Sequence, residues 1–435
     1  MNSRTRRPPV RALHLGLGNF FRAHQCVYTQ DSDPQWGIAA FTGSRPDAAV
    51  KLQQQDCVYT LDVRSADGDA YELCESLVAA HAAADHDSWT GYWADPAVEY
   101  LTITVTEAGY RRAAGGGLDF DDPAVRADLG SRTPRTAPGR IVAGLQARRR
   151  ADAGPMTLIP CDNLPGNGAV LRRVLTELAE RLDPGLSQWM EESIGYVSTA
   201  VDRITPATTA ADLARVAAAT GVHDEMPVIT EPYSEWVLSD TFVTTRPAWE
   251  TAGAVITDDV SPYEARKLTL LNGAHSLMAY LGSLRGRSTI AEAIADPTCR
   301  AGVERWWAEA GPHLLLSQLA AYQEALLQRF ANPGIQHGLA QVAMDGSQKL
   351  PVRILPTIRA ERAAGRVAEA AALMLAAWIR YLKNDPAPDP QRPRLLELAD
   401  QPLDRAVPAL LAVIDEELPD YPEFVEAVIT HATRL

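Results

Sequence analysis

The sequence predicts an α/β N-terminal part followed by a mainly α-helical C-terminal part. In the first half, short β-rich runs alternate with helical stretches, as repeated strand and helix units do. These runs are VRALHLGL, WGIAAFTG, YLTITVTE, MTLIPCDN and IGYVSTAV. From about Pro262 the chain is rich in Ala and Leu, with apolar residues at helical spacing and hardly any strand signal. We therefore expect a boundary between Thr257 and Pro262, with one domain over residues 1–258 and another over 259–435.

The composition is that of a globular protein without a nucleic-acid or membrane surface. The 435 residues are 46% hydrophobic, enough for two or three domains with their own cores. The net charge is −14 and the basic residues are scattered, which excludes a nucleic-acid footprint. No stretch reaches the roughly 20 apolar residues of a membrane span, and the N-terminus lacks the apolar core of a signal peptide. Five cysteines without CxxC spacing fit a reducing compartment, so we expect a cytoplasmic protein.

The first strand runs into a glycine turn of the kind that binds dinucleotides. VRALHL is followed by Gly16, Gly18, Asn19 and Phe20, and then by a helical pattern. In this context the backbone can approach a pyrophosphate at the start of a helix. Phe21 stands where the usual fingerprint has its third glycine, so a tight turn without a ligand is the alternative.

The end of the second strand leaves the choice between NAD and NADP open. The segment FTGSRPD has no acid directly after its apolar run to hold a ribose 2′-hydroxyl, and Asp47 lies slightly late. Arg45 in the same segment would instead favour a 2′-phosphate.

Two further segments place polar side chains after predicted strands. Asn163 lies in CDNLPGNG, at the carboxyl edge of a sheet, where folds of this kind bind ligands. A capping Asx turn is the alternative for this segment. Asp202 and Arg203 in VDRITP form a second cluster, which either binds a ligand or forms a structural salt bridge.

The most informative stretch is the apolar helical segment PYEARKLTLLNGAHSLMAY. It carries Glu264, Lys267, Asn272 and His275, which share one broad face at about 100° per residue. The rest of the predicted helix surface is apolar, so the helix is expected to be buried nearly all round. Desolvation would lower the pKa of such a lysine toward the range of a general base. A core helix with a snorkelling lysine is the alternative, but four polar groups on one face favour a site.

Two other chemistries fit this stretch less well. Tyr263 and Lys267 match the YxxxK pair of short-chain dehydrogenases, but they lie about 245 residues beyond the glycines, outside the nucleotide-binding domain. Cys161 and Cys299 have no neighbours with the character of metal ligands, so no metal site is expected.

Eight segments, in this order along nearly the whole chain, resemble the polyol-specific long-chain dehydrogenases, the mannitol dehydrogenase family. They are HLGLGNFFRAHQ, LTITVTEAGY, GGGLDFDDPAVRADL, CDNLPGNG, VDRITPAT, ITEPYSEWV, DDVSPYEARKLTLLNGAHSLMAYLG and DGSQKLPVRILPTIR. The resemblance implies a Rossmann-type N-terminal domain, a mainly helical C-terminal domain, an active site in the cleft between them, and chemistry without a metal.

The resemblance also implies a role for each matching residue. Lys267 would be the general base that takes the alcohol proton while hydride passes to the nicotinamide. Asn272 and Asn163 would donate hydrogen bonds to the developing alkoxide, as electrostatic stabilisation of that oxygen requires. His275 would orient a neighbouring hydroxyl, and Glu264 would connect the lysine to solvent.

The remaining matches divide into a substrate side and a cofactor side. Asp202 and Arg203 would shape the substrate pocket. Lys349 and Arg353 of DGSQKLPVR would contact the far end of the substrate, with solvated helix-end charges as the alternative. The cofactor side would comprise Gly16, Gly18, Asn19, Phe20, Arg45, Thr106 and Glu107.

We therefore expect an oxidoreductase that uses NAD, with NADP not excluded, to interconvert a sugar alcohol and a ketose, mannitol and fructose being the default pair. The rivals are hexuronate reductases acting on fructuronate or tagaturonate, and arabinitol or mannitol-1-phosphate dehydrogenases. A nucleotide-binding regulator without turnover would not need Lys267. The partners are a small-molecule polyol or ketose and neither nucleic acid nor membrane, in a monomer or small homo-oligomer.

Two features depart from the family. The link TQDSDPQ leads almost directly to the second strand, so the first helix must be short. The chain is also shorter than the mannitol 2-dehydrogenases it resembles, so loops that set substrate specificity are expected to be reduced.

Overall fold

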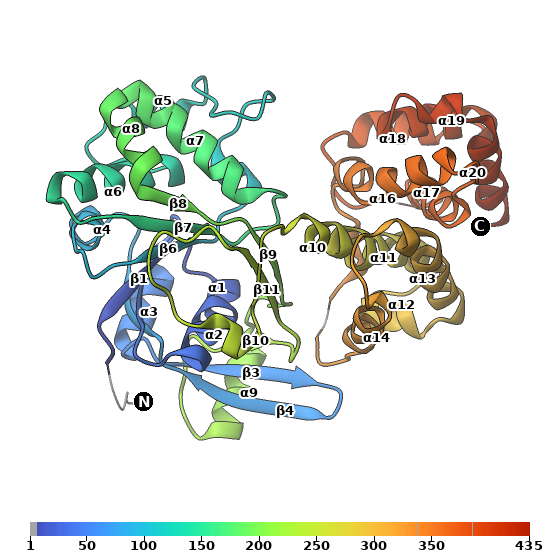
Figure 1. Ribbon diagram of the computed structural model, residues 1–435. Coiled ribbons are helices and arrows are strands. Elements are labelled where there is room, and N and C mark those ends of the chain that lie inside the picture. The colour runs from blue at the N-terminus through green and yellow to red at the C-terminus, as the bar shows by residue number, and fades with distance from the viewer. Residues whose placement is uncertain (1–6, 336, 385) are drawn as a thin grey trace. The chain divides into compact units, whose positions relative to one another are not determined.

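A six-stranded parallel sheet forms the centre of the N-terminal unit, which extends to Ser261 in the computed structural model (Figure 1). The structure describes residues 7–335, 337–384 and 386–435. In order across the sheet, the strands are β5 (Leu77–His81), β2 (Gly37–Phe41), β1 (Val10–Leu15), β6 (Tyr100–Ile103), β7 (Met156–Pro160) and β8 (Ile194–Tyr196). All neighbouring pairs are parallel, and the direction of winding reverses between β1 and β6. This is the strand order of a doubly wound α/β sheet.

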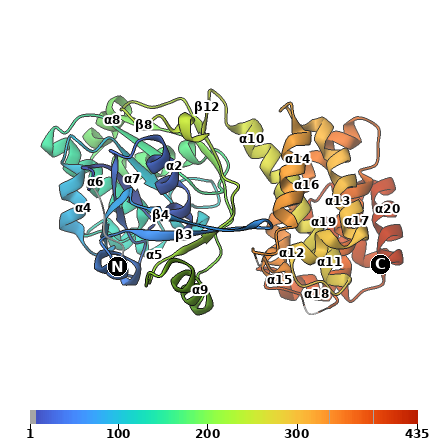
Figure 2. The same cartoon turned by 90° about the horizontal axis from the view of Figure 1, so that it is seen from below.

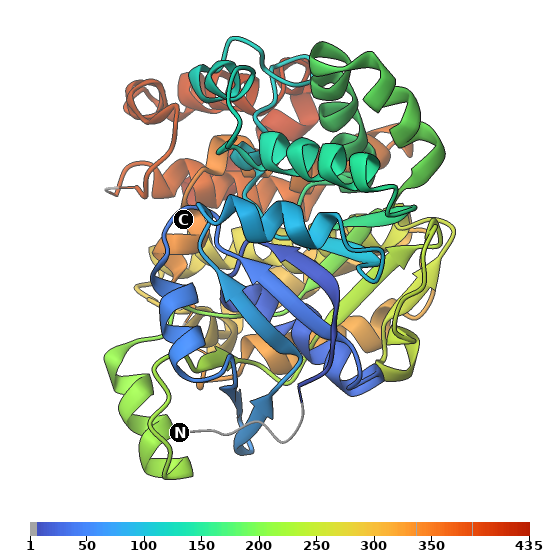
Figure 3. The same ribbon diagram turned by 90° about the vertical axis from the view of Figure 1, so that its left-hand side faces the viewer.

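Helices cover both faces of this sheet, because successive side chains of a strand point to opposite sides (Figures 1 and 3). Leu13 and Leu15 of β1 belong to a core that includes Trp89 of α4. Ala12 faces the other core, with Phe21 of α1. The helices of this unit are α1 (Asn19–Ala23), α2 (Gln25–Ser32), α3 (Asp47–Gln54), α4 (His86–Trp93), α5 (Pro123–Asp128), α6 (Ala137–Ala151), α7 (Asn167–Leu182), α8 (Pro184–Ser193) and α9 (Ala210–Thr220).

Two three-stranded sheets accompany the parallel sheet. One has the order β10 (Val228–Thr230), β3 (Tyr59–Ser65), β4 (Gly68–Cys74), and the other the order β12 (Val255–Thr257), β11 (Glu235–Ser239), β9 (Thr199–Asp202). The predicted run IGYVSTAV is therefore two strands, β8 and β9, in different sheets. An apolar run does not show from its sequence where one strand ends and the next begins.

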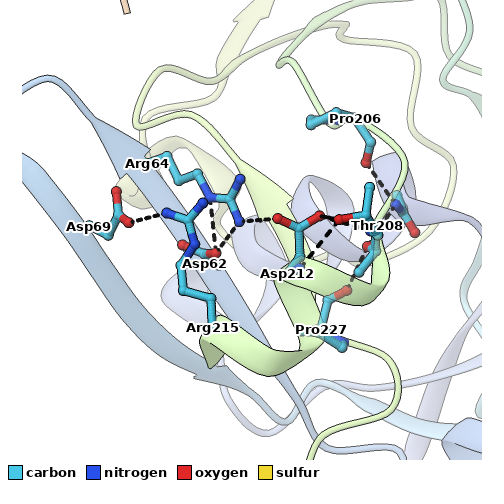
Figure 4. Close-up of polar contacts among 10 residues, drawn as sticks. Asp62, Arg64, Asp69, Pro206, Thr208, Asp212, Arg215 and Pro227 are labelled. Atoms are coloured by element: carbon cyan, nitrogen blue, oxygen red, sulfur yellow. Dashed lines mark hydrogen bonds and ion pairs between the residues drawn. The ribbon is translucent and has the colours of Figure 1, made fainter. Parts of the chain in front are cut away.

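A polar network fastens the β3–β4 hairpin to α9 (Figure 4). The Arg64 guanidinium lies 2.7 Å from an oxygen of Asp62 and 2.6 Å from one of Asp212. Arg215 of α9 lies 3.0 Å from Asp69 of β4. These ion pairs join the hairpin to α9, and Asp212 also accepts from the Thr209 hydroxyl at the end of the loop that follows β9, at 2.6 Å.

The C-terminal unit, from Pro262 onward, is helical, and α11 (Ala274–Leu284) packs against α13, α15 and α17 (Figure 2). Its other α-helices are α10 (Ser261–Arg266), α12 (Ile290–Ala295), α13 (Pro297–Ala310), α14 (Leu319–Phe330), α15 (Leu339–Ala343), α16 (Gly346–Ala363), α17 (Glu369–Tyr381), α18 (Arg392–Ala399), α19 (Leu403–Ile414) and α20 (Pro422–Arg434). The predicted fold class, α/β followed by mainly helical, is confirmed. Within the described ranges, no helix has the length and apolar character needed to cross a membrane.

The helix predicted from Pro262 changes type in its middle. Between α10 and α11 lies a π-helical segment, η3 (Lys267–Gly273). The expectation of a regular α-helix is wrong here, because a π-helix bonds residue i to residue i+5 and winds more widely. Lys267 and Asn272 are five residues apart, so this winding brings them closer to one line than an α-helix would.

Side chains from other helices donate hydrogen bonds to the carbonyl groups of η3. The indole N–H of Trp306 donates to the Thr269 carbonyl at 2.8 Å, and that of Trp307 to the Leu270 carbonyl at 2.9 Å. Both indoles come from α13. A Cβ on Gly273 would lie 2.6 Å from Nε1 of Trp306, so the glycine leaves space for the buried ring.

We predict that Gly273→Ala destabilises the protein by about 1–3 kcal/mol, because the added methyl displaces a rigid buried indole from its carbonyl partner. Urea unfolding would measure this loss. Gly311→Ala is the matched control, since a Cβ there meets only Leu319 at 3.7 Å. Equal stability of the two variants would contradict the proposed constraint on η3.

Candidate active site

The glycine turn of the N-terminal unit is fixed by the end of the neighbouring strand β6. Gly16 has a φ of +112°, and a Cβ at this position would overlap the Thr104 carbonyl oxygen. The Thr104 hydroxyl donates to the Gly16 carbonyl at 2.8 Å. The turn therefore lies at the carboxyl ends of β1 and β6, where the winding reverses and where sheets of this type bind ligands.

Phe21, which replaces the third glycine of the fingerprint, is part of the core. Its ring stacks on His14 with centroids 3.5 Å apart. The ring nitrogens of His14 lie 2.8 Å from the Thr102 hydroxyl and 3.0 Å from the Thr104 hydroxyl. Burial lowers the pKa of His14 to about 3, so the imidazole is neutral. Phe21 thus supports the turn from behind and leaves its solvent side open.

Asn19 is held by residues on both sides of it. Its amide donates to the Pro206 carbonyl at 3.0 Å and lies 3.4 Å from the Thr208 hydroxyl, while its oxygen accepts from buried Arg22 at 2.7 Å. Thr208 in turn donates to the Pro227 carbonyl, as Figure 4 shows. Asn19 therefore joins the glycine turn to the loop after β9.

The other predicted cofactor residues lie near the carboxyl ends of the same strands. Gly18 is exposed and Phe20 is half-buried at the start of α1. Arg45 is exposed after β2, and Thr106 and Glu107 are exposed after β6. Because β2, β1 and β6 are adjacent and parallel, the structure brings this set to one edge of the N-terminal unit. Exposed backbone at this edge fits the requirements of a dinucleotide.

Asn163 lies at the same sheet edge, in a turn built by its neighbours. Asp162 accepts from the Leu164 N–H at 2.9 Å and from the Tyr110 hydroxyl. Asn167 accepts from the Thr199 N–H at 2.9 Å. The Asx turn considered as the alternative thus forms at Asp162, and Asn163 is left exposed at the carboxyl end of β7. Sequence analysis did not predict the roles of Asp162 and Asn167, because their partners Tyr110 and Thr199 are distant in the chain.

Asp202 and Arg203 have different surroundings. Asp202 is the buried last residue of β9. The Arg203 guanidinium donates to the backbone carbonyls of Glu231, at 3.0 Å, and Ala23. Burial lowers the pKa of Arg203. These contacts support a positioning role for Arg203 within the N-terminal unit.

In the C-terminal unit, η3 and the start of α11 carry three of the predicted catalytic residues. Lys267 and Asn272 are half-buried and α10 has no buried residue, so the expected burial nearly all round the helix is found only in α11. His275 is buried, with 8% of its surface exposed. Burial, followed by the charges of His337, Arg353, Arg329 and Lys267, holds the pKa of His275 well below its usual value. The structure thus gathers cationic groups around a neutral imidazole.

Arg353 of α16 forms hydrogen bonds with η3 and α11. It donates to the Asn272 carbonyl at 3.2 Å and to the Ser276 hydroxyl at 2.8 Å, and burial lowers its pKa to about 10. Lys349, one turn earlier in α16, lies 4.0 Å from Asp345 and is half-buried. Arg353 is therefore not a solvated helix-end charge. Glu264 is half-buried in α10.

Sequence analysis missed His337, whose ring meets that of His275 at 5.1 Å and nearly at a right angle. It also missed Arg329, a buried residue of α14. His337 lies in a loop without a motif, and Arg329 lies in a helix whose apolar periodicity does not indicate a site. Across the part of the chain that the structure describes, no group of three or more His, Cys, Asp or Glu side chains is arranged to hold a metal ion.

The comparisons with known proteins cover both units. Residues 10–251 match the mannitol dehydrogenase Rossmann domain, and residues 259–435 match the mannitol dehydrogenase C-terminal domain. D-mannonate oxidoreductase of Escherichia coli (strain K12) is 36% identical over 444 residues, covering 96% of this chain and 91% of that protein. Mannitol 2-dehydrogenase of Cereibacter sphaeroides is 35% identical over 383 residues, covering 85% of this chain and 80% of that protein.

Among solved structures, the chain is similar to Pseudomonas fluorescens mannitol 2-dehydrogenase, determined as a ternary complex with NAD and D-mannitol. The TM-score is 0.84 at 33% identity, over 98% of this chain and 92% of that chain. These matches confirm the resemblance that the sequence motifs predict, and the chain belongs to the mannitol dehydrogenase family of oxidoreductases.

Proposed function

We propose that this protein is an NAD-dependent dehydrogenase that oxidises a sugar alcohol to a ketose and catalyses the reverse reduction, with D-mannitol and fructose as the default pair. The observation that carries the proposal is the π-helix, which sets Lys267 and Asn272 one i to i+5 turn apart beside buried His275. Segments of this type occur often at functional sites. In this proposal, residues 1–258 bind the dinucleotide and contribute Asn163, and residues 259–435 bind the substrate and carry the other catalytic residues.

Lys267 is proposed to take the proton of the reacting hydroxyl and to return it in the reverse direction. The side-chain amides of Asn272 and Asn163 donate hydrogen bonds to the oxygen as negative charge develops there, an effect that lowers the barrier most when the donors are fixed in advance. Glu264 passes the lysine proton to solvent. His275 binds a neighbouring hydroxyl, and Asp202 shapes the substrate pocket.

The cofactor is proposed to be NAD, held by the edge of the N-terminal unit. Gly16, Gly18, Asn19 and Phe20 would lie against the pyrophosphate, with Arg45 near the adenosine ribose and Thr106 and Glu107 on the nicotinamide side. A bound nicotinamide dinucleotide accepts or supplies the hydride. The open solvent side of the glycine turn, with Phe21 packed behind it, supports this proposal.

A second candidate is the oxidation of an aldonate to a ketouronate. Two observations favour it: the D-mannonate oxidoreductase relative matches 96% of the chain, and cationic Arg329, Arg353 and Lys349 lie near the histidines. A carboxylate substrate would need such charges at the end of its pocket.

We further propose that the protein works in the cytoplasm, as a monomer or small homo-oligomer. Its five cysteines are free and buried, which fits a reducing compartment.

Lys267→Ala should lower the turnover number by about 10²–10⁴-fold and leave NAD binding nearly unchanged, because the variant loses only the general base. Stopped-flow or steady-state absorbance of NADH measures turnover, and added methylamine should restore part of it. Lys383→Ala is the control, since Lys383 is exposed in the same unit. Near-normal turnover of the Lys267 variant would refute its role as the base.

Assays with D-mannitol and D-mannonate, each with NAD and NADP, should show the highest kcat/KM for D-mannitol with NAD. A preference for D-mannonate would establish the second candidate instead. Arg45→Ala should raise the KM for NADP more than that for NAD, because only NADP carries a 2′-phosphate. Absence of turnover with every pair would contradict both candidates.

Asn163→Ala and Asn272→Ala should each lower kcat/KM by about 10²-fold, the usual cost of one oxyanion donor. If both amides bind the same oxygen, the double variant loses less than the product of the single losses. The backbone carbonyl of Asn272 keeps its bond to Arg353 in these variants. The control is the double variant Asn163→Ala with Lys383→Ala, in which the two effects on kcat/KM should multiply. If the effects of Asn163→Ala and Asn272→Ala also multiply, the two amides act separately.

A further inference from the structure

Two neighbouring rings of the C-terminal unit, those of His275 and His337, each carry a buried nitrogen atom without a hydrogen-bond partner in the described part of the chain. Nε2 of His275 and Nδ1 of His337 are both buried, and neither has a hydrogen-bond partner among the residues that the structure describes. Each orphaned atom costs about 1–3 kcal/mol, so folded proteins keep few of them without a reason. Two such atoms on rings 5.1 Å apart point to a shared reason.

The position of His337 is fixed although its ring nitrogen is unpaired. Its N–H donates to the Ile335 carbonyl at 3.0 Å, and its own carbonyl accepts from Ile290 at the start of α12. Gly338 forms an isolated bridge with Thr289. On the other side, the His275 ring packs against Phe330 at 5.1 Å. These contacts hold the two imidazoles edge to face, with an interplanar angle of 87°.

The surroundings keep both rings neutral. Burial lowers the pKa of His337, and Lys349 lowers it further. The pKa of His275 is also lowered, by burial first and then by His337 and three cations. A neutral imidazole has one donor and one acceptor, whereas an imidazolium has donors alone. The pair therefore matches hydroxyl groups, which also donate and accept.

We propose that His337 is a substrate-binding residue that, together with His275, hydrogen-bonds hydroxyl groups of the polyol chain beyond the reacting carbon. This inference rests on the proposed function and extends it, because it assigns recognition of the non-reacting hydroxyls to a residue outside the catalytic helix. On binding, hydrogen bonds between the polyol hydroxyls and water are replaced by hydrogen bonds to the two imidazoles. No covalent bond forms or breaks.

His337→Phe provides the sharpest test, because phenylalanine keeps an aromatic ring of similar size and removes the hydrogen bond. We expect the KM for D-mannitol to rise about tenfold or more, with the KM for NAD within twofold of the wild type. The melting temperature should be unchanged or higher, since the variant loses an orphaned polar atom. A role in packing alone would leave the KM for D-mannitol unchanged.

Two further variants keep the test decisive. His337→Ala should show the same rise in KM, and added imidazole should reverse part of it. This measurement applies if the phenylalanine variant does not fold. Combined with His275→Phe, the His337→Phe change should cost less than the product of the single effects, because both rings bind the same ligand. His431→Phe is the control, since His431 pairs with Glu369 at 3.1 Å near the C-terminus.

The outcomes separate this inference from the proposed function. If the wild type oxidises D-mannitol but His337→Phe keeps its KM, or raises the KM for NAD in parallel, the role of His337 is refuted and the dehydrogenase function stands. If the wild type oxidises neither D-mannitol nor D-mannonate, the proposed function itself fails. A rise in KM for D-mannonate alone would assign the pair to a carboxylate and overturn hydroxyl recognition.

Discussion

The hydrogen bonds from outside donors to the carbonyls of η3 are the constraint on which the C-terminal unit's chemistry depends. Trp306, Trp307 and Arg353 reach three carbonyl groups within seven residues of helix. A π-turn is less favourable than an α-turn in isolation, and such segments are rare. Tertiary donors from α13 and α16 offset that cost, so the packing of these helices determines how Lys267 and Asn272 are presented.

In the N-terminal unit, the glycine turn is also held in place by side chains from other elements. Its glycine turn must come close to strand β6, and the Thr104 hydroxyl, fixed by neutral His14, holds the turn there. Phe21 fills the space behind it. Gly18, Lys267 and Asn272 are exposed or half-buried, whereas the aromatic rings that support these segments are buried, namely Phe21, Trp306 and Trp307. Rigid support of this kind is what preorganised catalysis requires.

The sequence was sufficient for the fold class, because alternating strands and helices and then helical periodicity are local signals. It also located Asn163 after β7, since strand ends are visible in the pattern. The π-helix could not be predicted in this way. LNGAH continues an α-helical apolar pattern, and the indoles that stabilise the wider turn lie more than thirty residues away in the chain. His337 was missed because it stands alone in a loop, and its relation to His275 exists solely in three dimensions.

The charges in the C-terminal unit bear on which substrate the protein uses. Arg353 is the cation that sequence analysis expected at the end of the substrate, but its guanidinium donates to the Asn272 carbonyl and the Ser276 hydroxyl. Lys349 lies 4.0 Å from Asp345, which partly neutralises it. A substrate carboxylate that binds Arg353 or Lys349 would have to compete with these contacts. The two neutral imidazoles, in contrast, keep buried nitrogen atoms that a hydroxyl can satisfy. A polyol and an aldonate both carry such hydroxyl groups, so the imidazole pair would bind the part of the chain that the two substrates share, and a carboxylate would be distinguished by the cations near the histidines.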